Sequence, residues 1–191
     1  MRDPNTSKNN LREALRQRRR AVDAQHQNLA ALALAESISE LPAWTEAQHI
    51  ALYMPSDGEI GTDTIRDLAM EQGKQMYLPV ITEALSLEFA RWQIEDPLCP
   101  NDYNIPEPPP HVPRIAAAGL DIIFLPLVGW DISGARLGMG GGFYDRTLSG
   151  VSGPLLVGLA HTCQQVQDIP VDDWDVGLDF VATDTALHHC R

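Results

Sequence analysis

The sequence predicts an α/β fold: a three-layer, mostly parallel, Rossmann-like sheet with flanking helices and a basic helix at its N-terminal end. Two observations carry this prediction. Short apolar runs alternate along the chain with segments of helical spacing, which is the pattern of α/β proteins. Residues 121–128 form a near-continuous apolar run, which is typical of a parallel strand buried on both faces. At 191 residues, the chain has the length of one domain, spanning 1–191.

The first segment, residues 1–22, is expected to form a basic helical arm. Ser7 is suited to cap its helix, and apolar residues follow at helical spacing. Lys8 and Arg12 are four residues apart, so they lie on one face of that helix. The segment carries seven basic and two acidic side chains, whereas the whole chain has a net charge of −12. We expect Lys8 and Arg12 to serve a phosphate bound by the body, and most of residues 16–20 to form a solvated face.

The other elements follow from apolar periodicity and from start and stop signals. Asp23 is suited to cap a second helix, and Thr62 to cap a third that stops at Gly73. A short helix is expected from about 142 to 148. Strands are expected at residues 49–54, 75–80, 85–92, 121–128, 154–160 and 180–182. Residues 97–113 hold seven of the fourteen prolines and predict a long extended loop, of a length that tends to be functional.

The composition disfavours several classes of protein. No run of about 18 apolar residues predicts a membrane span, and the polar, basic N-terminal segment does not resemble a secretory signal. Cys99, Cys163 and Cys190 are widely spaced and form no metal motif, which favours a reducing, cytoplasmic setting. Outside its basic arm the chain is strongly acidic, which disfavours a nucleic-acid partner. We expect a monomer that binds small molecules.

The most informative stretch is the glycine-rich segment at residues 136–146. Its glycines let the backbone approach a ligand closely, and successive N–H groups in such a loop form a nest for an anion. Arg136 supplies a fixed charge against phosphate, and Asp145 is a hard oxygen ligand suited to Mg²⁺. The segment lacks the Gly-Lys-Ser/Thr of a P-loop, and Phe143 stands where the dinucleotide fingerprint requires glycine. The simpler alternative is a flexible surface turn before a helix.

Ligands of parallel α/β sheets bind beyond the carboxyl ends of the strands. The loops after Met54, Val128 and Ala160 are therefore expected to share one rim. Such a rim would gather Glu59, the glycine-rich segment and Asp175 at a single site.

Several motifs, occurring in one order along nearly the whole chain, carry a resemblance to a known family. The most specific is Leu127-Val-Gly-Trp-Asp131 followed by Arg136-Leu-Gly-Met-Gly-Gly-Gly-Phe-Tyr-Asp145-Arg146. The others are Lys8-Asn-Asn-Leu-Arg12, Asp57-Gly-Glu59-Ile, Tyr103-Asn-Ile-Pro-Glu-Pro108 and Pro170-Val-Asp-Asp-Trp-Asp175. With these motifs the sequence resembles the 5-formyltetrahydrofolate cyclo-ligase family, also called methenyltetrahydrofolate synthetases, and its bacterial branch in particular.

The resemblance implies an enzyme that uses ATP and Mg²⁺ to convert 5-formyltetrahydrofolate into 5,10-methenyltetrahydrofolate, with release of ADP and phosphate. It implies phosphorylation of the formyl oxygen followed by ring closure, with Arg136 and Tyr144 as catalytic residues. The ATP-binding residues that it implies are Lys8, Arg12, Arg136, Leu137, Gly138, Met139, Gly140, Gly141, Gly142, Phe143 and Tyr144.

The resemblance also implies a folate-binding set and a metal pair. The folate would contact Met54, Glu59, Tyr103 and Tyr144, and an acid that accepts paired N–H donors suits a pterin ring. Magnesium would be held by Asp145 and Asp175, directly or through water. The acid-rich turn leaves Asp172 and Asp173 open as alternatives to Asp175.

Plain structural roles compete with these assignments. Lys8 suits a solvated helix face, and Met54, at the end of an apolar strand, suits the core equally well. Trp174 is expected to pack, and His161 to be a structural histidine.

Two other functions compete with the cyclo-ligase. One is a related ATP-dependent enzyme that acts on another substrate. The other is a non-catalytic RNA-binding module that uses the basic arm, which predicts salt-sensitive RNA binding and no ATP turnover.

Overall fold

A mixed eight-stranded sheet forms the centre of the computed structural model, which describes residues 4–190, with side chains from Lys8 onward. The strand order is β12-β11-β10-β7-β1-β2-β3-β6. These strands are β1 (His49–Ala51), β2 (Gln75–Ile81), β3 (Leu87–Trp92), β6 (Arg114–Ile115), β7 (Ile122–Pro126), β10 (Leu155–Ala160), β11 (Phe180–Thr183) and β12 (Leu187–His189).

The middle of this sheet is parallel, as predicted. Strand β1 lies between β2 and β7, with Ile50 opposite both Met76 and Ile122. Strands β10 and β11 continue the parallel order, whereas β3 and β12 run antiparallel to it and β6 pairs antiparallel with β3 at the edge. Two small antiparallel ribbons stand apart from the sheet: β4 (Cys99–Pro100) with β5 (Pro106–Glu107), and β8 (Gly129–Trp130) with β9 (Arg136–Leu137).

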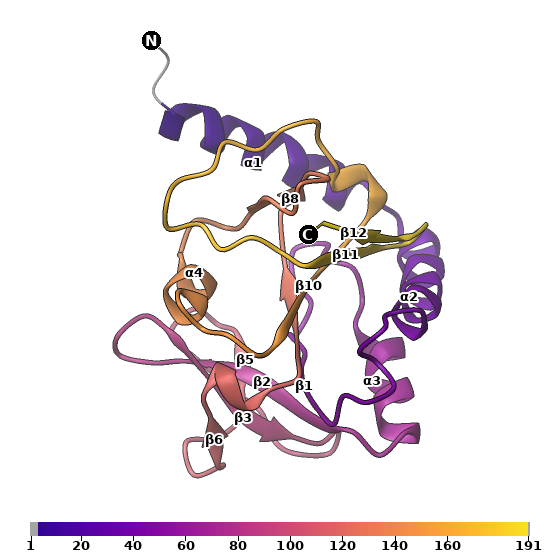
Figure 1. Cartoon of the computed structure of the whole chain (residues 1–191), viewed down its shortest axis with the longest axis vertical. Coiled ribbons are helices and arrows are strands. Elements are labelled where there is room, and N and C mark those ends of the chain that lie inside the picture. The colour runs from indigo at the N-terminus through magenta and orange to yellow at the C-terminus, as the bar shows by residue number, and fades with distance from the viewer. Residues whose placement is uncertain (1–3, 191) are drawn as a thin grey trace.

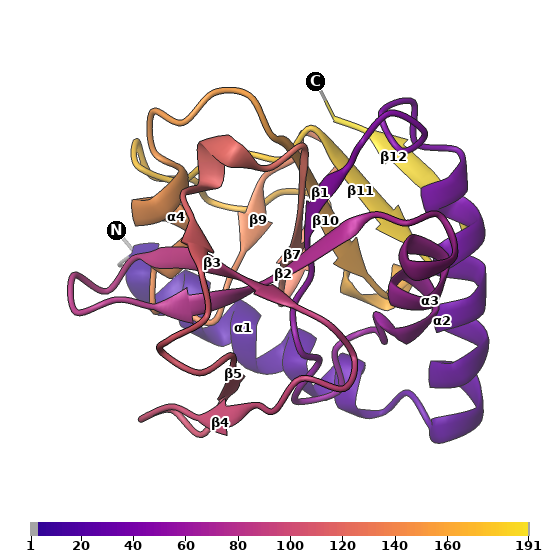
Figure 2. The ribbon, with the colours of Figure 1, turned by 90° about the horizontal axis from the view of Figure 1, so that it is seen from below.

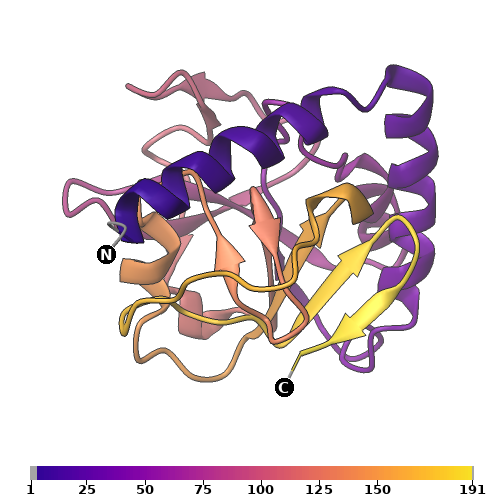
Figure 3. The ribbon, with the colours of Figure 1, turned by 90° about the horizontal axis from the view of Figure 1, so that it is seen from above.

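Helices cover both faces and one end of the sheet. The helical elements are α1 (Pro4–Arg20), α2 (Ala24–Ser39), α3 (Asp63–Glu71), α4 (Phe143–Leu148) and the 3-10 turns η1 (Ala117–Gly119) and η2 (Thr162–Gln164). Figures 1 and 2 show α2 and α3 together on one side of the sheet and α4 on the other. Seen from above in Figure 3, α1 crosses the end of the sheet. Within residues 4–190, no helix is long and apolar enough to cross a membrane.

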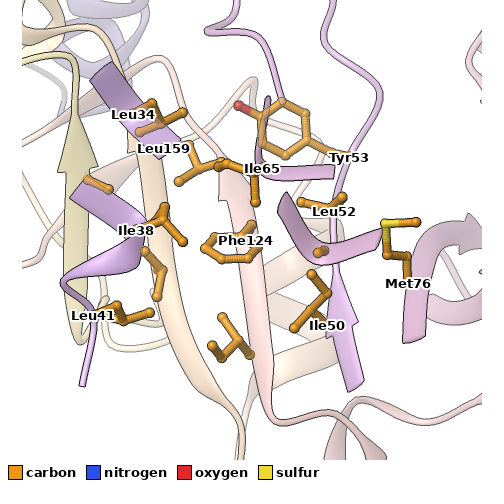
Figure 4. Close-up of a cluster of buried hydrophobic side chains, with 14 of the residues drawn as sticks. Leu34, Ile38, Leu41, Ile50, Leu52, Tyr53, Ile65, Met76, Phe124 and Leu159 are labelled. Carbon is orange, nitrogen blue, oxygen red and sulfur yellow. The ribbon is translucent and has the colours of Figure 1, made fainter. Parts of the chain in front are cut away.

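The larger core lies between the sheet and the α2–α3 pair (Figure 4). Leu34, Ile38 and Leu41 point from the α2 segment toward the sheet, where Phe124 of β7 stands at the centre. The opposite face of β7 contributes Ile123 and Leu125 to a second cluster that α4 and irregular segments cover. Since β7 is buried on both faces, its continuous apolar sequence is explained.

Helix α1 docks on the sheet end through a third, smaller cluster. Leu15 is fully buried there against Val128, Leu137 and other apolar side chains. Gly129 makes this approach possible, because a Cβ at that position would collide with the Leu15 side chain. The apolar face of the arm is therefore an anchor for the whole helix.

Most sequence-predicted elements are confirmed, and the differences lie at their ends. The first helix begins at Pro4, so Ser7 is within the helix and does not cap it. Asp23 caps α2 as predicted, accepting a hydrogen bond from the His26 backbone N–H at 2.9 Å. Thr62 precedes α3, but its hydroxyl donates to the Tyr53 carbonyl and makes no cap bond. The short strands β6 and β12 carry too few residues for periodicity to predict them.

The central position of Phe124 predicts a large loss of stability on truncation. Phe124→Ala should lower the free energy of unfolding by about 3–5 kcal/mol, because a fully buried ring leaves a cavity that the sheet cannot close. Urea denaturation measures the change. Leu29→Ala, at an exposed apolar position of α2, is the control and should stay within about 0.5 kcal/mol of the parent. Equal losses for both variants would contradict the proposed centre of the core.

Candidate active site

A pocket of about 890 Å³ opens beside α1 at the carboxyl ends of β1, β2 and β7. This is the edge at which ligands bind in parallel α/β sheets. It is lined by Lys8, Arg12, Tyr53, Met54, Ser56, Glu59, Leu78, Pro79, Ile81, Leu87, Ile105, Pro106, Glu107, Pro126, Leu127, Arg136, Leu137, Gly138, Met139, Gly140, Gly141, Gly142, Phe143, Tyr144, Asp145, Arg146, Ser149, Asp172, Trp174 and Asp175. The pocket thus gathers most of the predicted site residues.

The glycine-rich segment forms one wall of this pocket. It leaves strand β9 at Leu137 and enters α4 at Phe143, with Gly140 and Gly142 in the left-handed region at φ 101° and 67°. A Cβ on Gly138 would meet no atom within 4 Å, so the backbone there borders open space. The segment is therefore shaped for close approach of a ligand, as the sequence predicts.

Two cations from α1 face that wall. The Arg12 Nε donates to the Gly138 carbonyl at 2.9 Å, and a Cβ on Gly140 would lie 3.7 Å from the Arg12 guanidinium carbon. Lys8 donates from Nζ to Asp172 at 2.7 Å and to Asp175 at 2.8 Å. Burial lowers the pKa of the Lys8 ammonium, but these two carboxylates outweigh burial and raise the pKa. The Lys8 ammonium is consequently fixed by two ion pairs and is not a freely solvated surface group.

The predicted metal ligands also lie at this end of the pocket. Asp145 Oδ1 accepts from Arg136 Nη2 at 2.6 Å and from the Val176 N–H at 3.1 Å. Asp175 accepts from the Asp172 N–H at 2.9 Å in addition to Lys8. Burial raises the pKa of Asp175, and the bonds from Lys8 and the Asp172 amide outweigh it, so that the pKa is lowered. Each of the two carboxylates therefore lies within hydrogen-bond distance of a cation.

Among the three acids of the C-terminal turn, the structure separates two from the third. Asp172 and Asp175 line the pocket, whereas Asp173 does not. Within the described part of the chain, no three His, Cys, Asp or Glu side chains form a metal cluster. Two carboxylates nonetheless suit Mg²⁺, which binds through one or two of them together with substrate phosphates.

A buried acid marks the other end of the pocket. The Glu59 side chain is 9 % exposed and accepts from the Ser56 N–H at 3.0 Å. Burial raises the pKa of Glu59, while Ser56 and Arg19 oppose the rise. Burial raises the pKa of Tyr144 as well, and nearby Glu59 adds to the effect, so this phenol stays neutral. Half-buried Met54 lines the same region and also packs against the core.

The proline-rich loop reaches the pocket through residues other than the expected one. Tyr103 does not line the pocket; its exposed ring packs edge-on against Phe143 with centroids 5.6 Å apart. Glu107, which the sequence did not single out, is buried in the lining and accepts from the Ile81 N–H at 2.9 Å and from Asn101 Nδ2 at 2.7 Å. Its only sequence signal was its place in the motif Tyr103-Asn-Ile-Pro-Glu-Pro108 of the proline-rich loop.

Two further expectations have opposite outcomes. Trp174 was expected to pack, but the residue is 67 % exposed and lies at the pocket. His161 is a structural histidine, as predicted: it is buried outside the lining, and burial lowers its pKa. The loop after Ala160 was expected to border the site, but its residues His161 and Gln164 do not line the pocket. Gln164 instead donates to the Leu127 and Val128 carbonyls.

The prediction that most of residues 16–20 form a solvated face is confirmed for Gln17, Arg18 and Arg20, which are exposed, but not for Arg19, which is buried. Arg16, Arg19 and Arg20 all pair with Asp57, in the turn that follows β1. Arg19 is fully buried, and Arg18 remains exposed. Burial raises the pKa of Asp57, but the hydrogen bonds from Arg16, Arg20 and Arg19 outweigh it and lower the pKa to about 2. Three arginines of this run therefore surround Asp57, and we call this arrangement the clamp on Asp57.

A pocket that collects cations and backbone N–H groups at the carboxyl edge of a parallel sheet is typical of enzymes that bind nucleotide phosphates. Sequence comparison gives the particular family. The chain belongs to the 5-formyltetrahydrofolate cyclo-ligase family, whose profile matches residues 4–184. The resemblance carried by the motifs is confirmed.

Several curated relatives are similar over most of their length. The 5-formyltetrahydrofolate cyclo-ligase of Haemophilus influenzae is 39% identical over 173 residues, which cover 88% of this chain and 92% of the relative. That of Escherichia coli strain K12 is 37% identical over 176 residues, covering 88% and 96%.

Solved structures agree with this assignment. The 5,10-methenyltetrahydrofolate synthetase of Aquifex aeolicus superimposes with a TM-score of 0.83 at 28% identity, covering 96% of this chain and 93% of that one. The Mycoplasma pneumoniae synthetase, at 23% identity and a TM-score of 0.76, covers 93% of this chain and 98% of its own and supports the fold.

The clamp on Asp57 predicts a specific acid sensitivity. Because the folded pKa, about 2, is below the usual 3.8, the clamp contributes stability above pH 3.8 that is lost as the pH falls through 2. This contribution is on the order of 2 kcal/mol. Asp57→Asn should therefore be less stable than the parent near neutral pH, and the gap should narrow between about pH 5 and pH 2. Urea denaturation across this range measures the gap.

The matched control is Asp102→Asn, at an exposed position in the proline-rich loop. Its stability should follow that of the parent at every pH. If the stability difference between Asp57→Asn and the parent stays constant from about pH 5 to pH 2, the clamp does not lower the pKa of Asp57.

Proposed function

We propose that this chain converts 5-formyltetrahydrofolate into 5,10-methenyltetrahydrofolate with consumption of ATP, and that it does so in the pocket beside α1. Membership of the cyclo-ligase family makes the chain a ligase of folate metabolism. One observation carries the assignment of the pocket. A single cavity joins the phosphate-binding features of Lys8, Arg12 and the glycine-rich segment to the buried acid Glu59.

The phosphate end of the pocket suits the first step of this reaction. Transfer of the γ-phosphoryl group to the formyl oxygen turns a poor leaving group into a good one and releases ADP. Such a transfer requires positioning and charge neutralisation and no protein nucleophile. Lys8, Arg12 and Arg136 supply the charges, and the backbone from Gly138 to Gly142 supplies N–H donors. Arg136 and Tyr144 are the proposed catalytic residues, because both line the pocket and Tyr144 lies near both Glu59 and Arg136.

The second step needs a held folate. The folate N10 attacks the activated formyl carbon, the carbon–oxygen bond to phosphate breaks, and N10 loses its proton as the ring closes. Glu59 is the proposed acceptor of paired N–H groups of the pterin, and Met54 and Tyr144 line its surroundings. Tyr103 is proposed to cover the folate from the proline-rich loop, where its contact with Phe143 keeps it near the opening.

Magnesium is the proposed metal of this site. Asp145 and Asp175 would hold it beside the phosphates, where it would neutralise developing charge. Each of these carboxylates forms an ion pair: Asp145 with Arg136, and Asp175 with Lys8.

The ion pairs of helix α1 disfavour the alternative of RNA binding. Three of the basic residues that would contact RNA are engaged with Asp57, and Lys8 is engaged with two acids. We propose a monomer in the cytoplasm with small molecules as its partners. In keeping with a reducing setting, Cys99 and Cys163 are exposed thiols, and the described residues contain no disulfide.

An absorbance assay tests the proposed function. Protein, ATP, Mg²⁺ and 5-formyltetrahydrofolate are mixed, and formation of methenyltetrahydrofolate is followed. Product should appear only when all four components are present, and a chelator should stop it. ATP turnover without methenyl product would favour the related enzyme with a different substrate. Salt-sensitive RNA binding without turnover would favour the RNA-binding module.

Lys8 provides a test of the nucleotide end. Lys8→Met should raise the Michaelis constant for ATP about ten-fold or more, because it removes one partner of a charged contact and leaves Asp172 and Asp175 facing the phosphates. The constant for 5-formyltetrahydrofolate should change less than about two-fold. Arg18→Met, at an exposed position on the same helix, is the control and should leave both constants unchanged. An unchanged ATP constant in Lys8→Met would remove this residue from the site.

Glu59 provides the complementary test of the folate end. Glu59→Gln should raise the Michaelis constant for 5-formyltetrahydrofolate about ten-fold or more, since loss of the charge weakens acceptance of the pterin donors by roughly 1–3 kcal/mol. The ATP constant should move little. Glu83→Gln, at an exposed acid outside the pocket, should leave both constants unchanged. Equal effects of Glu59→Gln on the two substrates would place this acid outside the folate site.

A further inference from the structure

Arg19 is a buried cation that the proposed reaction does not use directly. It stands near the C-terminal end of α1, with a side chain that is 0 % exposed. Its Nε donates to the Asp57 carbonyl at 2.9 Å and its Nη2 to Asp57 Oδ2 at 2.7 Å. Its Nη1 donates to the Leu127 carbonyl at 3.1 Å, just beyond the end of β7. A buried guanidinium needs such a set of acceptors, so its position is fixed.

The same guanidinium contacts the turn that carries Glu59. Its Nη1 lies 3.5 Å from Glu59 Oε1. The turn closes on itself, because Glu59 N–H donates to the Ser56 carbonyl at 2.9 Å and Ser56 N–H donates to the Glu59 carboxylate at 3.0 Å. Asp57 and Gly58 have φ angles of 52° and 78°, and a Cβ on Gly58 would lie 3.2 Å from the Arg19 carbonyl. The turn is therefore pressed against the end of α1.

The charge of Arg19 also acts on Glu59. The ionisable groups that face Glu59 are Arg19 from α1, Asp57 of its own turn, Tyr53 after β1 and Tyr144 of α4. Arg19 is the cation of this set. Since burial raises the pKa of Glu59, the nearby guanidinium is what favours the ionised carboxylate together with the Ser56 amide.

We propose that Arg19 is the positioning residue for substrate recognition: it holds the Glu59 carboxylate in place and ionised, ready to accept the N–H donors of the pterin. The inference rests on the proposed function, because it gives Arg19 a role through Glu59 alone. Arg19 itself does not line the pocket. Helix α1 then serves both substrates, with Lys8 and Arg12 at the nucleotide and Arg19 behind the folate.

Steady-state kinetics of Arg19→Gln provide the first test. The Michaelis constant for 5-formyltetrahydrofolate should rise about ten-fold or more, while the ATP constant and kcat change less than about two-fold. Arg18→Gln, one residue away and exposed, is the control and should match the parent. A merely structural role would lower the active fraction, and hence kcat, without this split. That pattern, or equal rises in both constants, would overturn the inference.

A double variant tests whether Arg19 acts through Glu59. When Glu59 is already replaced by Gln, adding Arg19→Gln should change the folate constant by less than about two-fold, because the two substitutions remove one interaction. A further ten-fold rise in the double variant would mean that Arg19 acts elsewhere, and would overturn the inference.

Arg19→Lys keeps the test open if Arg19→Gln does not fold. Lysine retains the charge but loses the forked geometry, so the folate constant should rise with no shift along the pH axis. Where Arg19→Gln folds, the acid limb of folate binding should move to higher pH, since the cation that opposes protonation is gone. Identical folate constants for Arg19→Lys and the parent, or an unmoved acid limb in Arg19→Gln, would overturn the inference.

The outcomes separate this inference from the proposed function. If the parent protein forms no methenyl product, the proposed function fails and takes the inference with it. If the parent and Glu59→Gln behave as proposed but the Arg19 variants match Arg18→Gln, only the inference fails.

Discussion

The contact between helix α1 and the turn after β1 is the interaction on which the site depends. A buried guanidinium is costly unless hydrogen-bonded acceptors surround it. Arg19 meets this requirement with the carboxylate and carbonyl of Asp57 and with the carbonyl of Leu127. That contact holds the C-terminal part of α1 against the turn that carries Glu59, while the buried Leu15 anchors the middle of the helix. Lys8 and Arg12, on the same side of α1, line the pocket.

Charge pairing organises the nucleotide end before any ligand is bound. Lys8 rests between Asp172 and Asp175, and Arg136 rests against Asp145. These acids hold the cations in place, which reduces the conformational entropy that phosphate binding would otherwise cost. If a nucleotide binds here as proposed, its phosphates compete with these acids for the same cations. A divalent metal that draws the acids toward itself would ease that competition.

The sequence predicted local chemistry well and long-range pairing poorly. The glycine-rich segment, Lys8, Arg12 and Glu59 were identifiable because each belongs to a short motif, and the pocket brings them together. The burial of Arg19 was not identifiable, since nothing within a run of arginines shows which one meets an acid 38 residues later in the chain. Glu107 lies in a quoted motif, but its contribution to the pocket was missed because it depends on a contact with Ile81, in another strand. Trp174, flanked by acids, offered no local sign of whether its ring is buried.

The spacing of side chains along α1 has a consequence for how this chain can vary. Lys8, Arg12, Leu15 and Arg19 recur at intervals of four, three and four residues, which keeps them in phase on one side of an α-helix. From Lys8 to Arg19 the helix rises about 16 Å, and this rise sets the separation between the two substrate ends. A substitution at one of these positions alters only the contacts of that residue. Insertion or deletion of one residue between them would rotate the cations by about 100° relative to the anchor, so the length of this helix is under a stricter constraint than its composition.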